Sequence, residues 1–475
     1  MEMIENRTFD DLLAGDSASV TRTITEEDIH LYAYISGDVN PAHMDPAYAE
    51  TDMFHRVIAH GMLGSGLISA VLGTKLPGPG TIYLDQSLRF TRPVSPGDTI
   101  TAIVTVIEKR LDHHIVLLDC TCMNQNGETV ISGVATVKAP TEKVRRPRAA
   151  LPDVRIAEHV RYRNLVARAA DGAPVTTAVV HPCDPAVIAA VAEAVTAGLI
   201  APILIGPRAR VQAAAEAAGI DIAAFPLEDV PHSHAAAARA VALVREGRAA
   251  TLMKGALHTD ELMHAVLAAD GGLRTDRRVS HAYVMDVPGY ARPFIITDAA
   301  INIAPTVEEK ADIIRNAIEL SHTLGTECPN VAILSAVETV SPMLPSTMDA
   351  AALCKMADRG QITGGILDGP LAFDNAVSAD AAREKGIVST VAGRADILVV
   401  PDLEAGNMLA KQLTFMAGAD AAGIVLGARA PIILTSRADS ERTRIASCAL
   451  AVLLARRVAR AAGCDKDETP ARAAA

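Results

Sequence analysis

The hydrophobic pattern divides the chain into two regions that differ in secondary structure. In the first, up to about residue 140, four successive runs have the apolar and β-branched pattern of strands. Asn126-Gly127, between the last two runs, is a strong β-hairpin signal. The predicted strands cover residues 81–91, 98–109, 114–124 and 128–138. We therefore expect an antiparallel sheet at the end of this region.

Two helices are predicted before these strands. Residues 26–35 place acidic residues first and apolar residues at helical spacing, with Thr25 as the N-cap. The stretch 58–73 is nearly uncharged and rich in small residues, which predicts a helix buried on all sides. One buried helix wrapped by a curved antiparallel sheet is the hot-dog arrangement. The predicted fold of this region is therefore an α+β hot-dog domain.

The second region, from about residue 153, alternates short apolar runs with Ala-rich helical stretches. This alternation predicts βαβ units and a parallel sheet covered on both faces. No period of about twenty to fifty residues repeats, so a solenoid is excluded. The predicted strands are 176–180, 200–205, 251–253, 331–334, 397–400, 424–426 and 432–434, and helices are predicted at 185–197, 211–218 and 236–246.

A basic segment with prolines joins the two regions. Residues 143–152 contain three arginines, Pro147 and Pro152, and this composition predicts a solvated linker. We therefore expect a first domain at 1–142 and a second at 153–464. The Ala-rich end, 465–475, is predicted to be a frayed tail.

Composition narrows the range of partners. A chain of 475 residues is too long for one compact core. Its net charge of −12, the absence of Trp and an aromatic content of 3% argue against nucleic acid. No run resembles a membrane span, and the acidic start lacks the apolar core of a signal peptide. The seven cysteines have no C-x-x-C spacing, so we expect a reduced, cytoplasmic protein that binds neither nucleic acid nor membranes.

The first region carries a carboxylate and an imidazole five residues apart, Asp38 and His43. Gly37 and Pro41 bend the segment between the two helices into a shaped loop. Such a rigid loop suits a general acid and base that share one water molecule. The alternative is that Asp38 only caps a turn and His43 only packs.

The same segment resembles the MaoC-type, (R)-specific enoyl-CoA hydratase family. The matching residues are Ser36-Gly37-Asp38, Asn40-Pro41, His43, Asp45 and His60-Gly61-Met62. The resemblance implies that Asp38 and His43 add water across the double bond of a trans-2-enoyl thioester. It also implies substrate contacts at Asn40 and Gly61, with the Gly61 amide as oxyanion donor, a role that suits a helix start. Hot-dog domains also host thioesterases, but the Asp38/His43 spacing argues against that chemistry.

The second region has neither a G-x-x-x-x-G-K-[ST] loop nor a G-x-G-x-x-G turn opening a helix, so nucleoside-triphosphate and dinucleotide sites are not expected. Polar motifs instead adjoin its apolar runs, where the loops of α/β domains bind ligands. They are 368–378, 391–401, 404–407 and 434–440. Singly, each would be interpreted as a turn or a helix cap.

Together, these motifs resemble the phosphate acetyl/butyryltransferase family over about residues 160–460. The match extends to Lys254-Gly255, Asp286-Val287-Pro288-Gly289 and Thr297-Asp298-Ala299-Ala300. The resemblance implies two α/β subdomains with a cleft between them, and the reaction of acyl-CoA with phosphate to give acyl phosphate and CoA. It implies catalytic roles for Ser436 and Arg437. It implies substrate contacts at Lys254, Asp368, Asp374, Asn375, Gly406, Asn407 and Asp439.

Arg437 suits this chemistry because its planar, always-charged fork binds phosphate. One position departs from the acetyl-specific branch, in which an aspartate stands six residues after this arginine; here it is Thr443. The nearby acids are Asp439 and Glu441, and the surrounding residues look more like the butyryltransferase branch. Acyl length and the base therefore stay open.

The sequence thus predicts a bifunctional enzyme with acyl-CoA and phosphate as substrates, without a metal or cofactor. The alternative for the second region is an acyl-CoA sensor without catalysis, as in some relatives. By analogy with both families, we expect a homo-oligomer.

Overall fold

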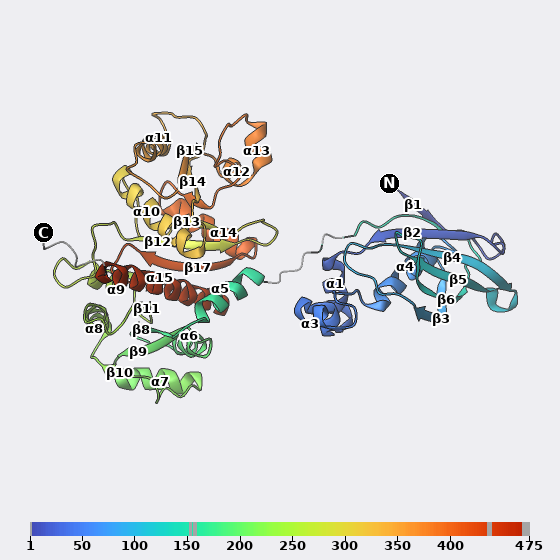
Figure 1. The fold of residues 1–475 in the computed structure, drawn as a ribbon, viewed down its shortest axis with the longest axis horizontal. Helices are drawn as coiled ribbons and strands as arrows, with labels where there is room; N and C mark the ends of the chain where they lie inside the picture. The colour runs from blue at the N-terminus through green and yellow to red at the C-terminus, as the bar shows by residue number, and fades with distance from the viewer. Residues whose placement is uncertain (1, 152–153, 155–158, 435–438, 468–475) are drawn as a thin grey trace, which may run out of the picture. The chain divides into compact units, whose positions relative to one another are not determined.

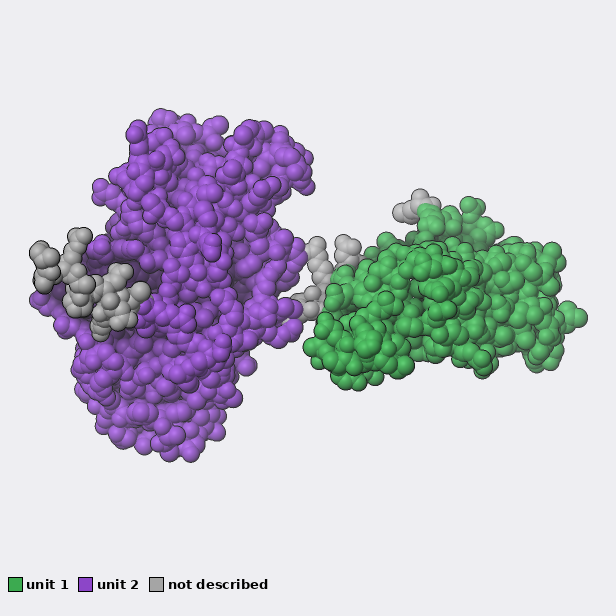
Figure 2. Space-filling view, in the orientation of Figure 1, with its two compact units in different colours: residues 1–157 green, residues 158–475 purple. Residues whose placement is uncertain are grey.

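The structure, a computed structural model, describes residues 2–151, 154, 159–434 and 439–467, with side chains up to Arg460. The chain divides into two compact units, Met1–Ala157 and Glu158–Ala475, coloured separately in Figure 2. Each unit is considered by itself. The domain limits 1–142 and 153–464 stay predictions. Within the described residues, no helix is both long and apolar enough to cross a membrane.

The first unit is built on a five-stranded antiparallel sheet in the order β2-β4-β5-β6-β3. The strands are β2 (Ser17–Thr23), β3 (Ile82–Phe90), β4 (Thr99–Arg110), β5 (Ile115–Met123) and β6 (Thr129–Lys138). The four strands predicted from the sequence are confirmed to within one residue at each end. Alternate side chains of β4 and β5, among them Val104 and Leu118, are fully buried beneath the sheet. This alternation is what gives the sheet one apolar face.

Four α-helices lie between β2 and β3 along the chain (Figure 1). They are α1 (Glu26–Ser36), α2 (Pro41–Met44), α3 (Pro46–Thr51) and α4 (Gly61–Thr74). Thr25 caps α1 as predicted, in a capping box with Asp28, and the helix ends at Gly37 with φ of 75°. Since a left-handed residue breaks the helix there, the chain turns directly into the loop that carries Asp38.

The prediction that α4 is buried on all sides is wrong for the single chain. Of its fourteen residues, all described, only Ile68, Val71 and Leu72 are buried, and they pack in the core under the sheet. Met62 is 54% exposed, and Gly66 is also exposed. Small apolar residues allow neighbouring segments to pack closely on any side of a helix. They do not show how many sides of the helix such segments cover.

The segment predicted as a linker is partly structured. Arg145–Pro147 forms strand β7, which pairs antiparallel with β1 (Met3–Glu5). The buried Asn6 fastens the same segment, because its Oδ1 accepts from the Val144 amide at 2.9 Å and its Nδ2 donates to the Glu142 carbonyl at 2.8 Å. A pairing across some 140 residues could not be deduced from local composition.

The second unit holds, within its described residues, an eleven-stranded sheet in the order β10-β9-β8-β11-β18-β17-β12-β13-β16-β14-β15. The strands are β8 (Val175–Val180), β9 (Ile200–Gly206), β10 (Leu227–Asp229), β11 (Thr251–Lys254), β12 (Ser280–Asp286), β13 (Phe294–Thr297), β14 (Asn330–Leu334), β15 (Ile366–Leu371), β16 (Ile397–Val399), β17 (Asp420–Leu426) and β18 (Ile432–Ile433). Every predicted strand is present.

The sheet is mixed, so the expectation of an all-parallel sheet is wrong at its centre. At one end of the sheet, the five strands β10, β9, β8, β11 and β18 run parallel to one another. At the other end, the four strands β13, β16, β14 and β15 are also parallel to one another. Between these two sets, β18, β17, β12 and β13 pair antiparallel. Three successive reversals make the two outer sets run in opposite directions. The cause is local: β12 and β13 are joined by a short connection without a helix, which suits antiparallel pairing.

Helices cover both faces of this sheet (Figure 1). They are α5 (Val160–Ala170), α6 (Pro185–Thr196), α7 (Arg208–Ala218), α8 (Ser233–Arg245), α9 (Thr259–Val266), α10 (Val307–Leu324), α11 (Pro345–Asp358), α12 (Phe373–Val377), α13 (Ala379–Glu384), α14 (Leu403–Met416) and α15 (Glu441–Asp467). One face carries a continuous core that includes α6, α10 and α15. The other carries two separate cores, one with α8 and α9 and one with α12, α13 and α14. The sheet is thus shared by two α/β subdomains.

Candidate active sites

The loop that carries Asp38 and His43 is held by short side chains that bind main-chain amides. Asp38 Oδ1 accepts from the Asn40 amide at 3.2 Å, and Asn40 Oδ1 caps α2 through the Ala42 amide at 3.1 Å. Asp45 caps α3 in the same way. Asp38 therefore does form the turn expected in the alternative interpretation. Its carboxylate is nevertheless exposed and accessible to a ligand.

His43 is half-buried, and its hydrogen bond defines its tautomer. Its Nδ1 lies 2.8 Å from the main-chain oxygen of Ile58. Because a carbonyl oxygen only accepts, Nδ1 carries the proton, and Nε2 of the neutral ring is left as an acceptor. Metal-ligating or hydrogen-bonding atoms of Asp38, His43 and His60 all lie within 4.8 Å of one another. The structure thus brings the predicted pair together, and adds His60.

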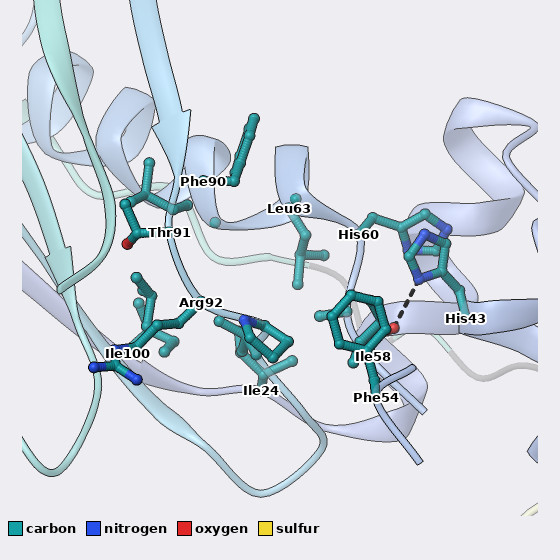
Figure 3. Close-up of a pocket in the computed structure, with 17 residues that line it drawn as sticks. Ile24, His43, Phe54, Ile58, His60, Leu63, Phe90, Thr91, Arg92 and Ile100 are labelled. Carbon is teal, nitrogen blue, oxygen red and sulfur yellow. Dashed lines mark hydrogen bonds between the residues drawn. The ribbon is translucent and has the colours of Figure 1, made fainter. Parts of the chain in front are cut away.

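A cavity of about 270 Å³ opens beside these groups (Figure 3). His43, His60 and Gly61 line it together with many apolar side chains, among them Phe54 and Ile100. Figure 3 shows the two imidazoles side by side, and their ring centres are 3.9 Å apart. Such a cavity can take an apolar chain while the polar groups face its reactive end.

Gly61 is the first residue of α4, and the preceding His60 makes no side-chain cap. The amides of a first helical turn have no partner within the helix, so they can bind a developing negative charge. A Cβ added at Gly61 would lie 3.0 Å from Cε1 of Phe90, which is tight. Glycine therefore lets the helix start approach both Phe90 and a ligand closely.

In the second unit, two of the predicted motifs meet at the end of β13. The buried Asp298 accepts from the amides of Ala300 and Ile301 at 2.9 and 3.0 Å. A Cβ added at Gly406 of α14 would lie 2.8 Å from the Asp298 carbonyl oxygen, and Asn407 donates to the Ala299 carbonyl at 3.1 Å. The motifs 297–300 and 404–407 thus contact each other.

Asp374 and Asn375 form a second group, after β15. Asn375 is fully buried and donates to Glu338 at 3.3 Å, while its Oδ1 has no partner among the described residues. Lys385 binds Asp374 at 3.2 Å. Although desolvation opposes it, this ammonium group and the Asn375 amide lower the pKa of Asp374. Asp368 lies within β15 and accepts from the adjacent amide of Gly369 at 2.8 Å.

Lys254 ends β11, whose register pairs Met253 with Ile433 of β18. Lys254 therefore lies level with Leu434, the last residue before 435–438. Ser436 and Arg437 lie outside the described residues, so their roles stay predictions. Asp439 is described, and Arg444 donates to its main-chain oxygen at 2.7 Å.

Two residues that the sequence analysis missed lie on β12. His281 is fully buried, neither ring nitrogen has a hydrogen-bond partner among the described residues, and Tyr283 packs edge-on at 4.5 Å. Burial lowers the pKa of His281, with Asp298 opposing, and burial raises the pKa of Tyr283 to about 12, with Asp439 adding to the rise. The two carboxylates that act on these rings, Asp298 and Asp439, belong to separate predicted motifs. The sequence signal that could have pointed to this site was a histidine, His281, within an apolar run.

Gly423 of β17 packs against the same two rings. A Cβ there would lie 3.0 Å from Tyr283 and 3.1 Å from His281. β12 and β17 are also the strands at which the direction of the sheet reverses. These rings therefore lie where the two subdomains join.

Comparison with known proteins identifies both units. The family model described as phosphate acetyl/butaryl transferase matches residues 232–452, and the model described as MaoC like domain matches residues 15–118. A phosphate acetyltransferase of Rhizobium meliloti is 62% identical over 301 residues, covering 63% of this chain and 95% of that protein.

Two solved structures are also similar. A branched-chain phosphotransacylase from Enterococcus faecalis V583 has a TM-score of 0.53 and 29% identity, and the match covers 59% of this chain and 99% of that one. The (R)-hydratase PhaJ1 from Pseudomonas aeruginosa is 45% identical over 33% of this chain and 100% of that one, with a TM-score of 0.32.

Proposed function

The chain belongs to the phosphate acetyl/butyryltransferase family, and we propose that it is a bifunctional enzyme acting on CoA thioesters. The second unit would transfer an acyl group between CoA and phosphate. The first unit, with its MaoC-like domain, would hydrate a trans-2-enoyl-CoA. Both activities bind the same carrier, which gives the fusion a chemical rationale.

One observation carries the hydratase proposal: His43 and the uncapped start of α4 line a single apolar cavity, and Asp38 has a side-chain oxygen within 4.8 Å of the His43 ring. Asp38 and Nε2 of His43 can both accept from one water molecule. In hydration, the water oxygen bonds to C3 of the enoyl group, and one of these acceptors takes the released proton. The thioester oxygen gains charge and accepts from the Gly61 amide. A proton then goes to C2, which restores the thioester.

The same three groups could hold a divalent metal ion, since the set is two imidazoles and a carboxylate. We favour a water molecule over a metal ion at this site, because the first unit matches the MaoC-like domain and resemblance to that family implies water addition. The competing function for the first unit is that of a thioesterase, in which water would attack the carbonyl carbon and release CoA. Thiol release from a saturated acyl-CoA without phosphate would favour that alternative.

For the second unit, the 62% identical phosphate acetyltransferase makes acetyl-CoA the first candidate substrate. A phosphate oxygen would attack the thioester carbonyl carbon, the C–S bond would break, and CoA would leave as the thiolate. We propose that Arg437 and Ser436 bind the phosphate. The two separate cores on one face of the sheet, one with α8 and α9 and one with α12, α13 and α14, support a boundary between two subdomains near β12 and β17.

The test is a pair of assays on the intact protein. Loss of enoyl absorbance from crotonyl-CoA measures hydration, and phosphate-dependent thiol release from acetyl-CoA and butyryl-CoA measures transfer. Arg437→Lys keeps the charge but loses the fork, so transfer should fall ~10²-fold while hydration is unchanged. If acetyl-CoA binds the wild type without phosphate-dependent thiol release, the second unit is a sensor and the transferase proposal is wrong.

A further inference from the structure

His60 is a buried histidine that the proposed chemistry does not use. It is 3% exposed, precedes Gly61 at the start of α4 and lines the apolar cavity. Its Nε2 lies 2.9 Å from the main-chain oxygen of Asp38, twenty-two positions earlier in the chain. A carbonyl oxygen accepts only, so Nε2 carries a proton and donates it. In the neutral ring, Nδ1 is then unprotonated.

The remaining contacts of the ring join several elements. The His43 ring of α2 stacks on it with centres 3.9 Å apart and a tilt of 38°, and the Tyr32 ring of α1 is 5.0 Å away. Nδ1 is buried and has no hydrogen-bond partner among the described residues. One side chain thus contacts the Asp38 loop, the His43 ring and the helix α1 that leads into that loop, and its own backbone continues into Gly61.

We infer that His60 is a positioning residue of the first active site, an inference that rests on the proposed hydratase function. The Nε2–H bond holds the Asp38 backbone, and the stacked ring holds His43. Because His60 adjoins Gly61, both groups are held relative to the amide that would stabilise the oxyanion. Misplacing catalytic groups by about 1 Å can cost ~10² in rate, so such a frame affects turnover without touching the substrate's reacting atoms.

Two substitutions separate this role from simple core packing. His60→Gln retains an N–H close to the position of Nε2, so it can still donate to the Asp38 carbonyl. His60→Asn is too short to reach that oxygen. Both variants lose the ring, so the stacking on His43 and the packing of the core suffer in similar measure. The difference between the two therefore isolates the hydrogen bond.

In the intact chain, we expect kcat for crotonyl-CoA hydration to fall ~10²-fold in His60→Asn and ~10-fold in His60→Gln, with KM within about threefold of wild type in both. Their melting temperatures should be lowered by similar amounts. Equal kcat values in the two variants, or a His60→Asn enzyme within twofold of wild type, would overturn the inference. So would a loss that appears in KM alone.

A second measurement needs no activity. The ¹⁵N resonances of His60, assigned by their absence in His60→Gln, should show a protonated Nε2 and an unprotonated Nδ1 in the wild type at neutral pH. The opposite tautomer would exclude the bond to Asp38 and overturn the inference even in an active hydratase. The expected tautomer in a protein that does not hydrate crotonyl-CoA would instead show that the hydratase proposal has failed while the structural arrangement holds.

Discussion

In the first unit, the candidate site is built from one stretch of chain between Asp38 and Gly61, and its groups are held by hydrogen bonds within that stretch. In the second unit, the candidate residues come from segments up to about 180 positions apart, and two of these motifs, 297–300 and 404–407, meet only because β13 and α14 lie together in the fold. The first site therefore depends on a local shape. The second depends on the topology of the whole sheet, so distant substitutions should alter it more readily.

The largest effect is expected at the local site. Asp38→Asn and His43→Ala should each lower hydration of crotonyl-CoA by ~10²–10⁴-fold, because each removes a positioned acid or base. Phosphate-dependent acyl transfer should be unchanged in both. The two rates are measured on the same preparation of intact protein, which makes each activity the control for the other. Hydration within a few-fold of wild type would mean that this pair is not catalytic.

A smaller loss is expected at the start of α4. Gly61→Ala adds a Cβ that would lie 3.0 Å from Phe90, at the end of the helix that lines the cavity. We expect kcat/KM for hydration to fall ~10-fold. Gly66→Ala is the matched control, because no atom lies within 4 Å of the added Cβ in the same helix. It should leave the rate unchanged and stabilise the unit by up to ~1 kcal/mol. Equal effects of the two variants would contradict this.

These local features were also the easiest to predict from the sequence. The Thr25 cap, the end of α1 at Gly37 and the meeting of Asp38 with His43 all follow from residues a few positions apart. The role of His60 could not be predicted, because its bond to the Asp38 carbonyl depends on how α4 packs beneath the sheet. The sequence motif His60-Gly61-Met62 indicated only that His60 lies near the site.

The centre of the second unit was predicted less well. Short apolar runs gave the strands, but the hairpin of β12 and β13 was missed, and with it the reversal of the sheet. Strand direction depends on the connections and on pairings between distant segments, which hydrophobic periodicity does not report. His281 and Tyr283 were missed for the same reason, since only the pairing of β12 with β17 places Gly423 against them.

His281 should make the stability of the second unit depend on pH. Burial lowers its folded-state pKa, so below its unfolded pKa of about 6.5 the unfolded chain binds a proton that the folded chain does not. Its contribution is therefore fully present above that pH and is lost as the pH falls, by up to ~1.4 kcal/mol per pH unit. His281→Leu should remove this dependence between pH 6.5 and 5. Denaturant unfolding at several pH values measures it.

The ring nitrogens of His281 have no partner among the described residues, so His281→Leu loses no described side-chain hydrogen bond. We expect its stability at pH 7.5 to be within about 1 kcal/mol of wild type, since replacing an unpaired buried polar group by an apolar one is close to neutral. His264→Leu, which replaces an exposed histidine of α9, is a control that should keep the wild-type pH dependence. A destabilisation of several kcal/mol at pH 7.5 would show that the ring has an essential partner.

The last prediction concerns the segment that joins the two units, and it tests whether the two sites are independent. A fragment of residues 1–142 lacks β7 and the Val144 amide that Asn6 binds, whereas a fragment of residues 1–151 retains both. Asn6 is 1% exposed, so its Oδ1 would lose a buried partner in the shorter fragment. We expect the longer fragment to be more stable by ~1–3 kcal/mol in urea unfolding, and both to hydrate crotonyl-CoA, because none of the missing residues adjoins the cavity. Asn6→Ala in the longer fragment should lower the free energy of unfolding by a similar amount.

Equal stability of the two fragments would show that the β1–β7 pairing does not contribute. A longer fragment that is inactive until residues 159–475 are added back would show that the first site needs the second unit.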